Sequence, residues 1–130
     1  MMANYYGKGR TNAFRVKDFD AFVAAAAPFG QVHAEADDRV IVLASGEAGD
    51  FTAYDEASDT ETDLRDILAD HLRDGEIAIL MSVGSQKHQF LEGWAMAVHS
   101  SGETLGLALT DIYREINETF PECDYAEVGS

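Results

Sequence analysis

The chain has 130 residues, of which 46% are hydrophobic, so it can bury a core without a disulfide or a structural metal. Its 24 acidic residues against 9 Lys and Arg give a net charge of −15, which would repel nucleic acids and anionic membranes. The composition therefore favours a single domain over residues 1–130 that contacts neither directly. A lone cysteine, Cys123, cannot form an internal disulfide, and no segment resembles a signal peptide, so we expect a cytoplasmic protein in a reducing cytosol.

The first part of the chain predicts short strands around one helix. The expected strands cover residues 14–17, 32–36, 39–44 and 51–54. Between the first two, Asp18 can accept hydrogen bonds from the first turn of a helix that ends near Pro28. The aliphatic run over residues 40–43 predicts a strand that is buried on both faces.

A second helix is predicted between Thr60 and Gly75. Thr60 and Asp63 have the spacing of a capping box, and Gly75 can end the helix in the left-handed conformation. The aliphatic side chains of this segment fall on one stripe: Leu64, Ile67, Leu68 and Leu72. The stripe predicts one buried face, from which the acidic residues project away.

The last part of the chain predicts three strands and a helix. Apolar residues alternate along residues 77–83, and further strands are expected over 91–99 and 105–109. A final helix over residues 111–120 would bury Ile112, Ile116 and Phe120. The order β-α-β-β-β-α-β-β-β-α predicts an α+β fold with a mainly antiparallel sheet and three helices.

Charge is unevenly distributed along the chain. Residues 1–17 contain four basic residues and no acidic one, whereas the remainder has a net charge of −19. Residues 1–12 combine two adjacent tyrosines, two glycines and the bases Lys8 and Arg10, which predicts a basic aromatic arm. The bases of this arm could pair with acids of the same domain, or the arm could dock onto a partner or a second protomer. Residues 121–130 are expected to form a frayed acidic tail.

Motifs for catalysis or metal binding are not found in the sequence. The four histidines have no i, i+4 spacing and no cysteine partner. Asp59, Glu61 and Asp63 have the offsets of a calcium loop, but Leu64 stands where such a loop needs glycine. The sequence therefore predicts a protein that is not an enzyme, with no cofactor and no metal.

Two long runs and a turn carry a resemblance to a known group of proteins. NYYGKGRTNAFRVKD, GEIAILMSVGSQKHQFLEGWAMAV and the Gly-Glu-Thr turn before LTDIY resemble small acidic proteins of phages and conjugative elements, over most of the chain. The resemblance implies an anti-defence factor of the anti-CRISPR or antirestriction type, many of which imitate the charge of DNA. Such inhibitors act by occupying a surface, so no catalytic residue carries over. The basic arm departs from the pattern, because a pure DNA mimic would not need it.

These observations predict a non-enzymatic inhibitor that occupies a basic nucleic-acid-binding surface of a bacterial defence complex, such as a CRISPR surveillance complex. The predicted contact residues are the acids of the second helix and its entry: Asp55, Glu56, Asp59, Glu61, Asp63, Asp66, Asp70 and Asp74. Acids three or four residues apart on a helix repel, so their repetition favours a function for the charge. Two alternatives are an acidic accessory or antidote module of a hetero-complex without DNA mimicry, and a small enzyme whose site has no sequence signature.

Overall fold

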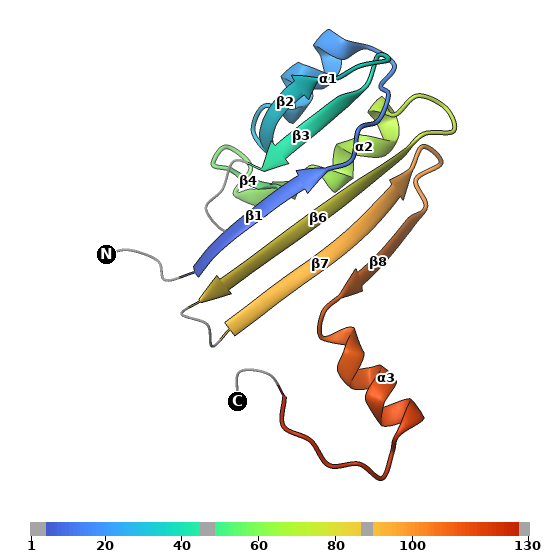
Figure 1. The fold of residues 1–130 in the computed structure, drawn as a ribbon. Coiled ribbons are helices and arrows are strands. Elements are labelled where there is room, and N and C mark those ends of the chain that lie inside the picture. The colour runs from blue at the N-terminus through green and yellow to red at the C-terminus, as the bar shows by residue number, and fades with distance from the viewer. Residues whose placement is uncertain (1–4, 45–48, 87–89, 128–130) are drawn as a thin grey trace.

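The computed structural model describes residues 5–44, 49–86 and 90–127, which form a twisted sheet with helices at one face and at one end (Figure 1). The main sheet is antiparallel, in the order β2-β3-β1-β6-β7-β8. Its strands are β1 (Tyr5–Thr11), β2 (Gly30–Ala34), β3 (Val40–Ala44), β6 (Ile77–Gln86), β7 (Phe90–His99) and β8 (Thr104–Ala108). A separate hairpin consists of β4 (Thr52–Asp55) and β5 (Thr60–Asp63), and the helices are α1 (Phe19–Ala26), α2 (Arg65–His71) and α3 (Asp111–Thr119).

The α+β class, the mainly antiparallel sheet, the three helices and the predicted order are confirmed. The boundaries of the second helix were predicted wrongly. Thr60–Asp63 pairs with Thr52–Asp55 as β5, so α2 begins only at Arg65 and no Thr60 capping box forms. Gly75 does not end the helix, since α2 stops at His71; Gly75 instead takes a φ of 85° in the turn before β6.

Residues 5–11 form the strand β1 and not part of an arm, which corrects the prediction for the N-terminal segment. β1 lies between β3 and β6, in register with β6 from Tyr5 opposite Gln86 to Thr11 opposite Leu80. The expected strand over residues 14–17 is reduced to two isolated bridges, from Phe14 to Val40 and from Val16 to Leu72.

Glycine at position 9 allows another segment to cross β1 at close range. A Cβ atom at Gly9 would lie 2.1 Å from the carbonyl oxygen of Gly49, far inside van der Waals contact. The same carbonyl accepts a hydrogen bond of 2.8 Å from the buried Ser82 hydroxyl. The absence of a side chain at Gly9 therefore lets residue 49 bind β6 across the strand.

One face of the sheet carries the hydrophobic core. The largest fully buried apolar side chains are Phe14, Phe22, Phe51, Leu64, Leu68, Leu72, Leu80, Val40, Val42 and Val98. Phe14 and Phe22 make an edge-to-face contact with ring centroids 5.7 Å apart, which joins the start of the chain to α1. Most of the predicted stripe of the second helix is thus in the core, with Ile67 packed at its margin.

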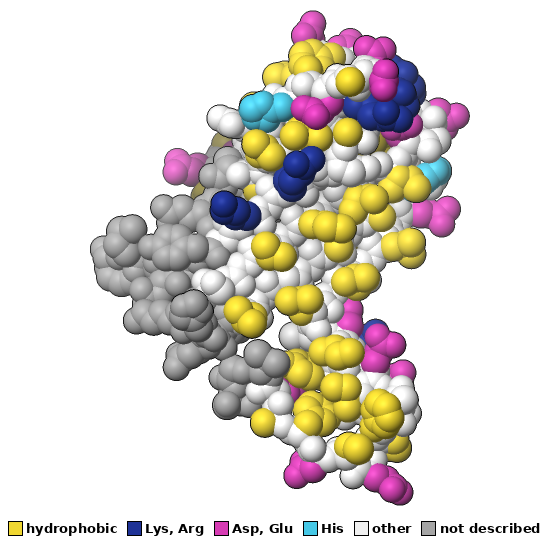
Figure 2. Space-filling model, viewed as in Figure 1, with side chains coloured by type: hydrophobic (Ala, Val, Ile, Leu, Met, Phe, Trp, Pro, Cys, Tyr) yellow, Lys and Arg dark blue, Asp and Glu magenta, His cyan; other side chains and the backbone are white. Residues whose placement is uncertain are grey.

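The opposite face of the sheet is apolar and exposed. On β6, Ala78, Leu80 and Ser82 point into the core, while Met81 and Val83 point outward and are 57% and 59% exposed. Figure 2 shows apolar side chains gathered over β6, β7 and β8 on this side, with acidic side chains mainly around the margin. The alternation along residues 77–83 is confirmed, but most of its large aliphatic side chains point to the exposed face of the sheet and not into the core.

Helix α3 was wrongly predicted to bury its apolar residues. No residue of α3 is buried, and Ile112 and Phe120 are 53% and 57% exposed. The helix extends beyond the end of β8, away from the core (Figure 1). After Pro121, the tail returns along α3, where Tyr125 stacks on Tyr113 and donates a hydrogen bond to Asn117, so its described part is not simply frayed. Among the described residues, no helix is long and apolar enough to cross a membrane.

Candidate functional site

The predicted acidic residues lie on the β4–β5 hairpin, on α2 and in the turn that follows α2. We call these eight residues the acidic surface: Asp55, Glu56, Asp59, Glu61, Asp63, Asp66, Asp70 and Asp74. Seven of them are exposed and Asp63 is half-buried. The same stretch, 55–74, contains two basic residues, Arg65 and the exposed Arg73. The hairpin and α2 are contiguous in the chain, so the structure keeps most of these acids on one structural unit.

Some of these carboxylates also hold the hairpin turn together. The Asp55 carboxylate accepts hydrogen bonds from the Ala57 N–H (3.0 Å) and the Ser58 hydroxyl (2.9 Å). Asp59 takes a positive φ of 54°, which an aspartate tolerates better than most residues. Its carboxylate accepts a hydrogen bond from the Tyr54 hydroxyl, and this bond raises the pKa of Tyr54 above its ordinary value. Asp55 and Asp59 therefore stabilise the turn by hydrogen bonds, in addition to contributing negative charge to the acidic surface.

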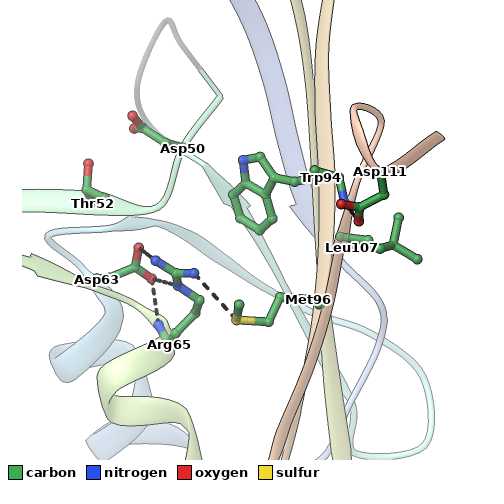
Figure 3. Close-up of a pocket in the computed structure, with 11 residues that line it drawn as sticks. Asp50, Thr52, Asp63, Arg65, Trp94, Met96, Leu107 and Asp111 are labelled. Carbon is green, nitrogen blue, oxygen red and sulfur yellow. Dashed lines mark hydrogen bonds and ion pairs between the residues drawn. The ribbon is translucent and has the colours of Figure 1, made fainter. Parts of the chain in front are cut away.

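Asp63 differs from the other acids because its charge is already paired. Its two carboxylate oxygens accept hydrogen bonds from Nε and Nη2 of Arg65, both at 2.9 Å. This pairing raises the pKa of Arg65 further above its ordinary value. The guanidinium also lies 5.7 Å from the ring centroid of Trp94, and Figure 3 shows Asp63, Arg65 and Met96 converging there. Asp63 thus anchors the start of α2 to β7 and has little free charge to offer a partner.

The N-cap residue of α2, Leu64, makes no side-chain capping hydrogen bond, and Asp66 instead bonds the chain just before the helix. Its Oδ2 accepts a hydrogen bond of 3.1 Å from the Asp63 N–H just before the helix. Only Asp66 and Asp70 lie within α2, and Asp74 lies beyond its end. The predicted series of repulsions along one helix is therefore reduced to the single pair Asp66 and Asp70.

A cleft beside the acidic surface has no counterpart in the sequence prediction. It has a volume of about 490 Å³ and opens between the start of α2 and strands β7 and β8 (Figure 3). Its lining includes Asp50, Thr52, Asp63, Arg65, Trp94, Met96 and Asp111. Asp63 neutralises Arg65 and Asp111 forms an ion pair with Arg114 (3.6 Å), so Asp50 is the carboxylate of the cleft that has no ion pair with a described residue. Only the tertiary fold brings these residues together, since they come from four separate segments of the chain.

Other candidate sites are limited. Within the part of the chain that the structure describes, no three His, Cys, Asp or Glu side chains are grouped so as to hold a metal ion. Cys123 is an exposed free thiol near the end of α3. One of the four histidines, His88, lies outside the described residues.

Comparison with known proteins gives no match: neither protein-family models, nor curated proteins, nor solved structures are significantly similar to this chain. The resemblance to anti-defence proteins of phages and conjugative elements therefore stays a prediction.

Replacing Asp63 by Asn should destabilise the protein more than a change at any fully exposed acid. D63N removes one partner of a charge-assisted bidentate pair, and half-buried pairs of this kind contribute about 1–2 kcal/mol. We expect the melting temperature to fall by about 4–8 °C. The control is D70N, which removes an exposed charge and should change stability by less than about 0.5 kcal/mol. Equal melting temperatures for the two variants would contradict the role of Asp63.

Proposed function

We propose that this protein is a non-enzymatic inhibitor of a bacterial defence complex, and that its acidic surface occupies a basic nucleic-acid-binding surface of that complex. The observation that carries the proposal is the exposure of seven carboxylates on one contiguous stretch, residues 55–74, which contains only two arginines, and one of them, Arg65, is neutralised by Asp63. A stable fold does not require so many unpaired acids close together. The anti-CRISPR or antirestriction class and its cytosolic site of action belong to the same proposal.

The amount of charge is adequate for imitation of DNA. A compact chain of this length has a radius of gyration of about 14 Å and hence a diameter of about 36 Å. Duplex DNA carries one charge per 1.7 Å, so about 21 phosphates occupy that length. The net charge of −15 is of the same order. The protein could therefore replace a comparable length of DNA on a basic surface.

The proposal is tested in a bacterium that carries one defined CRISPR or restriction system. Expression of the protein should raise the plating efficiency of a targeted phage at least tenfold, while a phage that the system does not target plates equally with and without the protein. No protection against any of several CRISPR and restriction systems would contradict the proposal. The purified complex should then lose its binding of target DNA when the protein is added.

Binding to the defence complex should depend strongly on salt. The Debye length falls from about 10 Å at 0.1 M salt to about 3 Å at 1 M, so contacts between exposed charges weaken. The dissociation constant is measured at both concentrations and should rise at least tenfold. A change of less than threefold would show that the contact is mainly apolar, and DNA mimicry would be wrong.

A second candidate function is supported by the apolar face of the sheet. An accessory or antidote module of a hetero-complex would need a surface for a permanent partner, and exposed apolar patches mark such surfaces. In this case the partner would cover β6, β7 and β8, and its affinity would be nearly independent of salt. The salt titration therefore separates the two functions.

A further inference from the structure

Two apolar surfaces of this chain are largely exposed among the described residues. The first, which we call the open sheet face, carries Ile77, Met81, Val83, Leu91, Leu105 and Leu107 on the side opposite to α1 and α2. The second is the stripe of α3, where Ile112, Ile116 and Phe120 follow one another at intervals of four residues. Figure 2 shows apolar side chains over both the sheet and the projecting end of the molecule.

The exposure is larger than expected for a monomer. The chain has an accessible surface of 8702 Å², whereas a compact monomer of its mass would expose about 6,800 Å². The most exposed apolar residue of the open sheet face, Leu105, is 78% exposed. Leu107, Ile112 and Phe120 are also more than half exposed. A concentration of exposed apolar side chains of this kind marks an interaction surface.

The connection between β8 and α3 holds the helix away from its own sheet. Only Leu109 and Thr110 separate the two elements. The Leu109 N–H donates to the Gly93 carbonyl (2.9 Å), and the Asp111 carboxylate accepts from the Ala108 N–H (2.8 Å). The stripe of α3 would have to break these bonds to fold back over its own β6 and β7. A sheet from another molecule can reach it without that change.

Charge and shape make the two surfaces complementary. By register with β6, Lys8 and Arg10 of β1 lie beside Val83 and Met81 on the open sheet face, and neither base forms an ion pair with a described residue. On α3, Glu115 and Glu118 are exposed. The open sheet face also contains a hollow of about 280 Å³ between Lys8, Arg10, Leu43, Met81 and Val83, which can receive a bulky apolar side chain.

The length of α3 also suits the open sheet face. Its nine residues make a helix of about 14 Å at 1.5 Å per residue. The four strands from β1 to β8 span a similar width, about 14 Å at 4.8 Å per strand. One helix laid across these strands would reach from the exposed leucines of β8 to the bases of β1.

We propose that the protein forms a two-fold homodimer in which α3 of each copy packs across the open sheet face of the other. In a two-fold dimer, each contact between the α3 stripe of one copy and the open sheet face of the other occurs twice. This chain carries both surfaces, so two copies can satisfy both contacts. The acids of α3 then approach Lys8 and Arg10 of the second copy. This inference does not rest on the proposed inhibitory function, and the acidic surface stays exposed on the opposite side of the sheet.

The dimer is tested by sedimentation equilibrium and light scattering of the full chain. The wild type should have twice the mass of the 14.2 kDa chain at micromolar concentration. L105E and I112E, one in each surface, should raise the dimer dissociation constant at least a hundredfold. The matched control is F19E, because Phe19 is an exposed apolar residue of α1 outside both surfaces, and it should change the constant less than threefold. A wild-type monomer at 50 μM, or variants that dimerise as tightly as the wild type, would overturn the proposal.

Cross-linking separates this arrangement from other dimers and does not depend on the glutamate variants being folded. A photoreactive phenylalanine replaces Ile116, and the labelled chain is mixed with an isotopically heavy chain. Cross-links should join position 116 of one copy to residues 77–109 of the other. Cross-links within one chain, or between the two α3 helices, would show that the helix has a different partner and would overturn the proposal.

Discussion

Deletion of residues 1–11 is expected to abolish cooperative folding. The deletion removes β1 from the centre of the sheet, so β3 and β6 each lose the strand to which they are hydrogen-bonded. Circular dichroism and thermal melting should show loss of the cooperative transition. An arm outside the domain would have been removable, so a truncated protein that melts like the wild type would contradict the position of β1.

A single substitution in β1 should destabilise the fold in the same way as the deletion, but to a smaller extent. Thr11 is buried, and its Oγ1 accepts a hydrogen bond of 2.9 Å from the Val42 N–H of β3. T11V keeps the shape of the side chain but leaves that N–H without its partner, which should destabilise the fold by about 1–3 kcal/mol. The control is K8Q, because Lys8 is an exposed residue of the same strand, and it should change stability by less than about 0.5 kcal/mol.

Neutralising part of the acidic surface should reduce inhibition by well over tenfold without unfolding the protein. Four of its members are exposed and make no side-chain hydrogen bond or ion pair with a described residue, so they are suitable for substitution: E56Q, E61Q, D70N and D74N. Charge pairs in interfaces commonly contribute on the order of 1.5 kcal/mol or more each. Phage plating efficiency and displacement of target DNA from the complex measure inhibition, and thermal melting measures stability.

The matched control has the same change in net charge at other places. D20N, E35Q, D38N and E103Q also remove four exposed acids, but from α1 and from the β2–β3 and β7–β8 connections. The control variant should keep most of the inhibition, because its four substituted acids lie outside the acidic surface. Salt largely screens exposed charges that are more than about a Debye length from the partner. Equal loss in both variants would mean that net charge alone is responsible. Full inhibition by the first variant would show that the acidic surface is not the contact.

Much of the fold could be predicted from local patterns. The alternation along residues 77–83, the cap at Asp18 and the stripe of Leu64, Leu68 and Leu72 appear in the structure. The Asp18 carboxylate accepts the Ala21 N–H at 3.0 Å, as the sequence indicated. These features depend on residues within a few positions of one another, and the conformational preferences of such residues are encoded locally.

The candidate site was less predictable. The sequence correctly indicated that the acids of the hairpin and α2 are mostly exposed, because long-range packing rarely buries an unpaired carboxylate. It did not indicate that Asp63 is paired with Arg65 beside Trp94, since Trp94 lies on a strand about thirty residues away. The cleft lined by Asp50 and Asp111 was missed for the same reason.

Composition and periodicity alone determined that this chain is acidic, that it is α+β and where most strands and helices lie. Tertiary structure decided that residues 5–11 form a central strand, because pairing on both edges outweighs the weak strand preference of a glycine-containing segment. It also decided which apolar stripes enter the core. Leu80 and Ile112 both belong to regular amphipathic patterns, yet Leu80 is buried and Ile112 is exposed. The physical reason is that periodicity defines a face, whereas burial requires a second surface close enough to cover it.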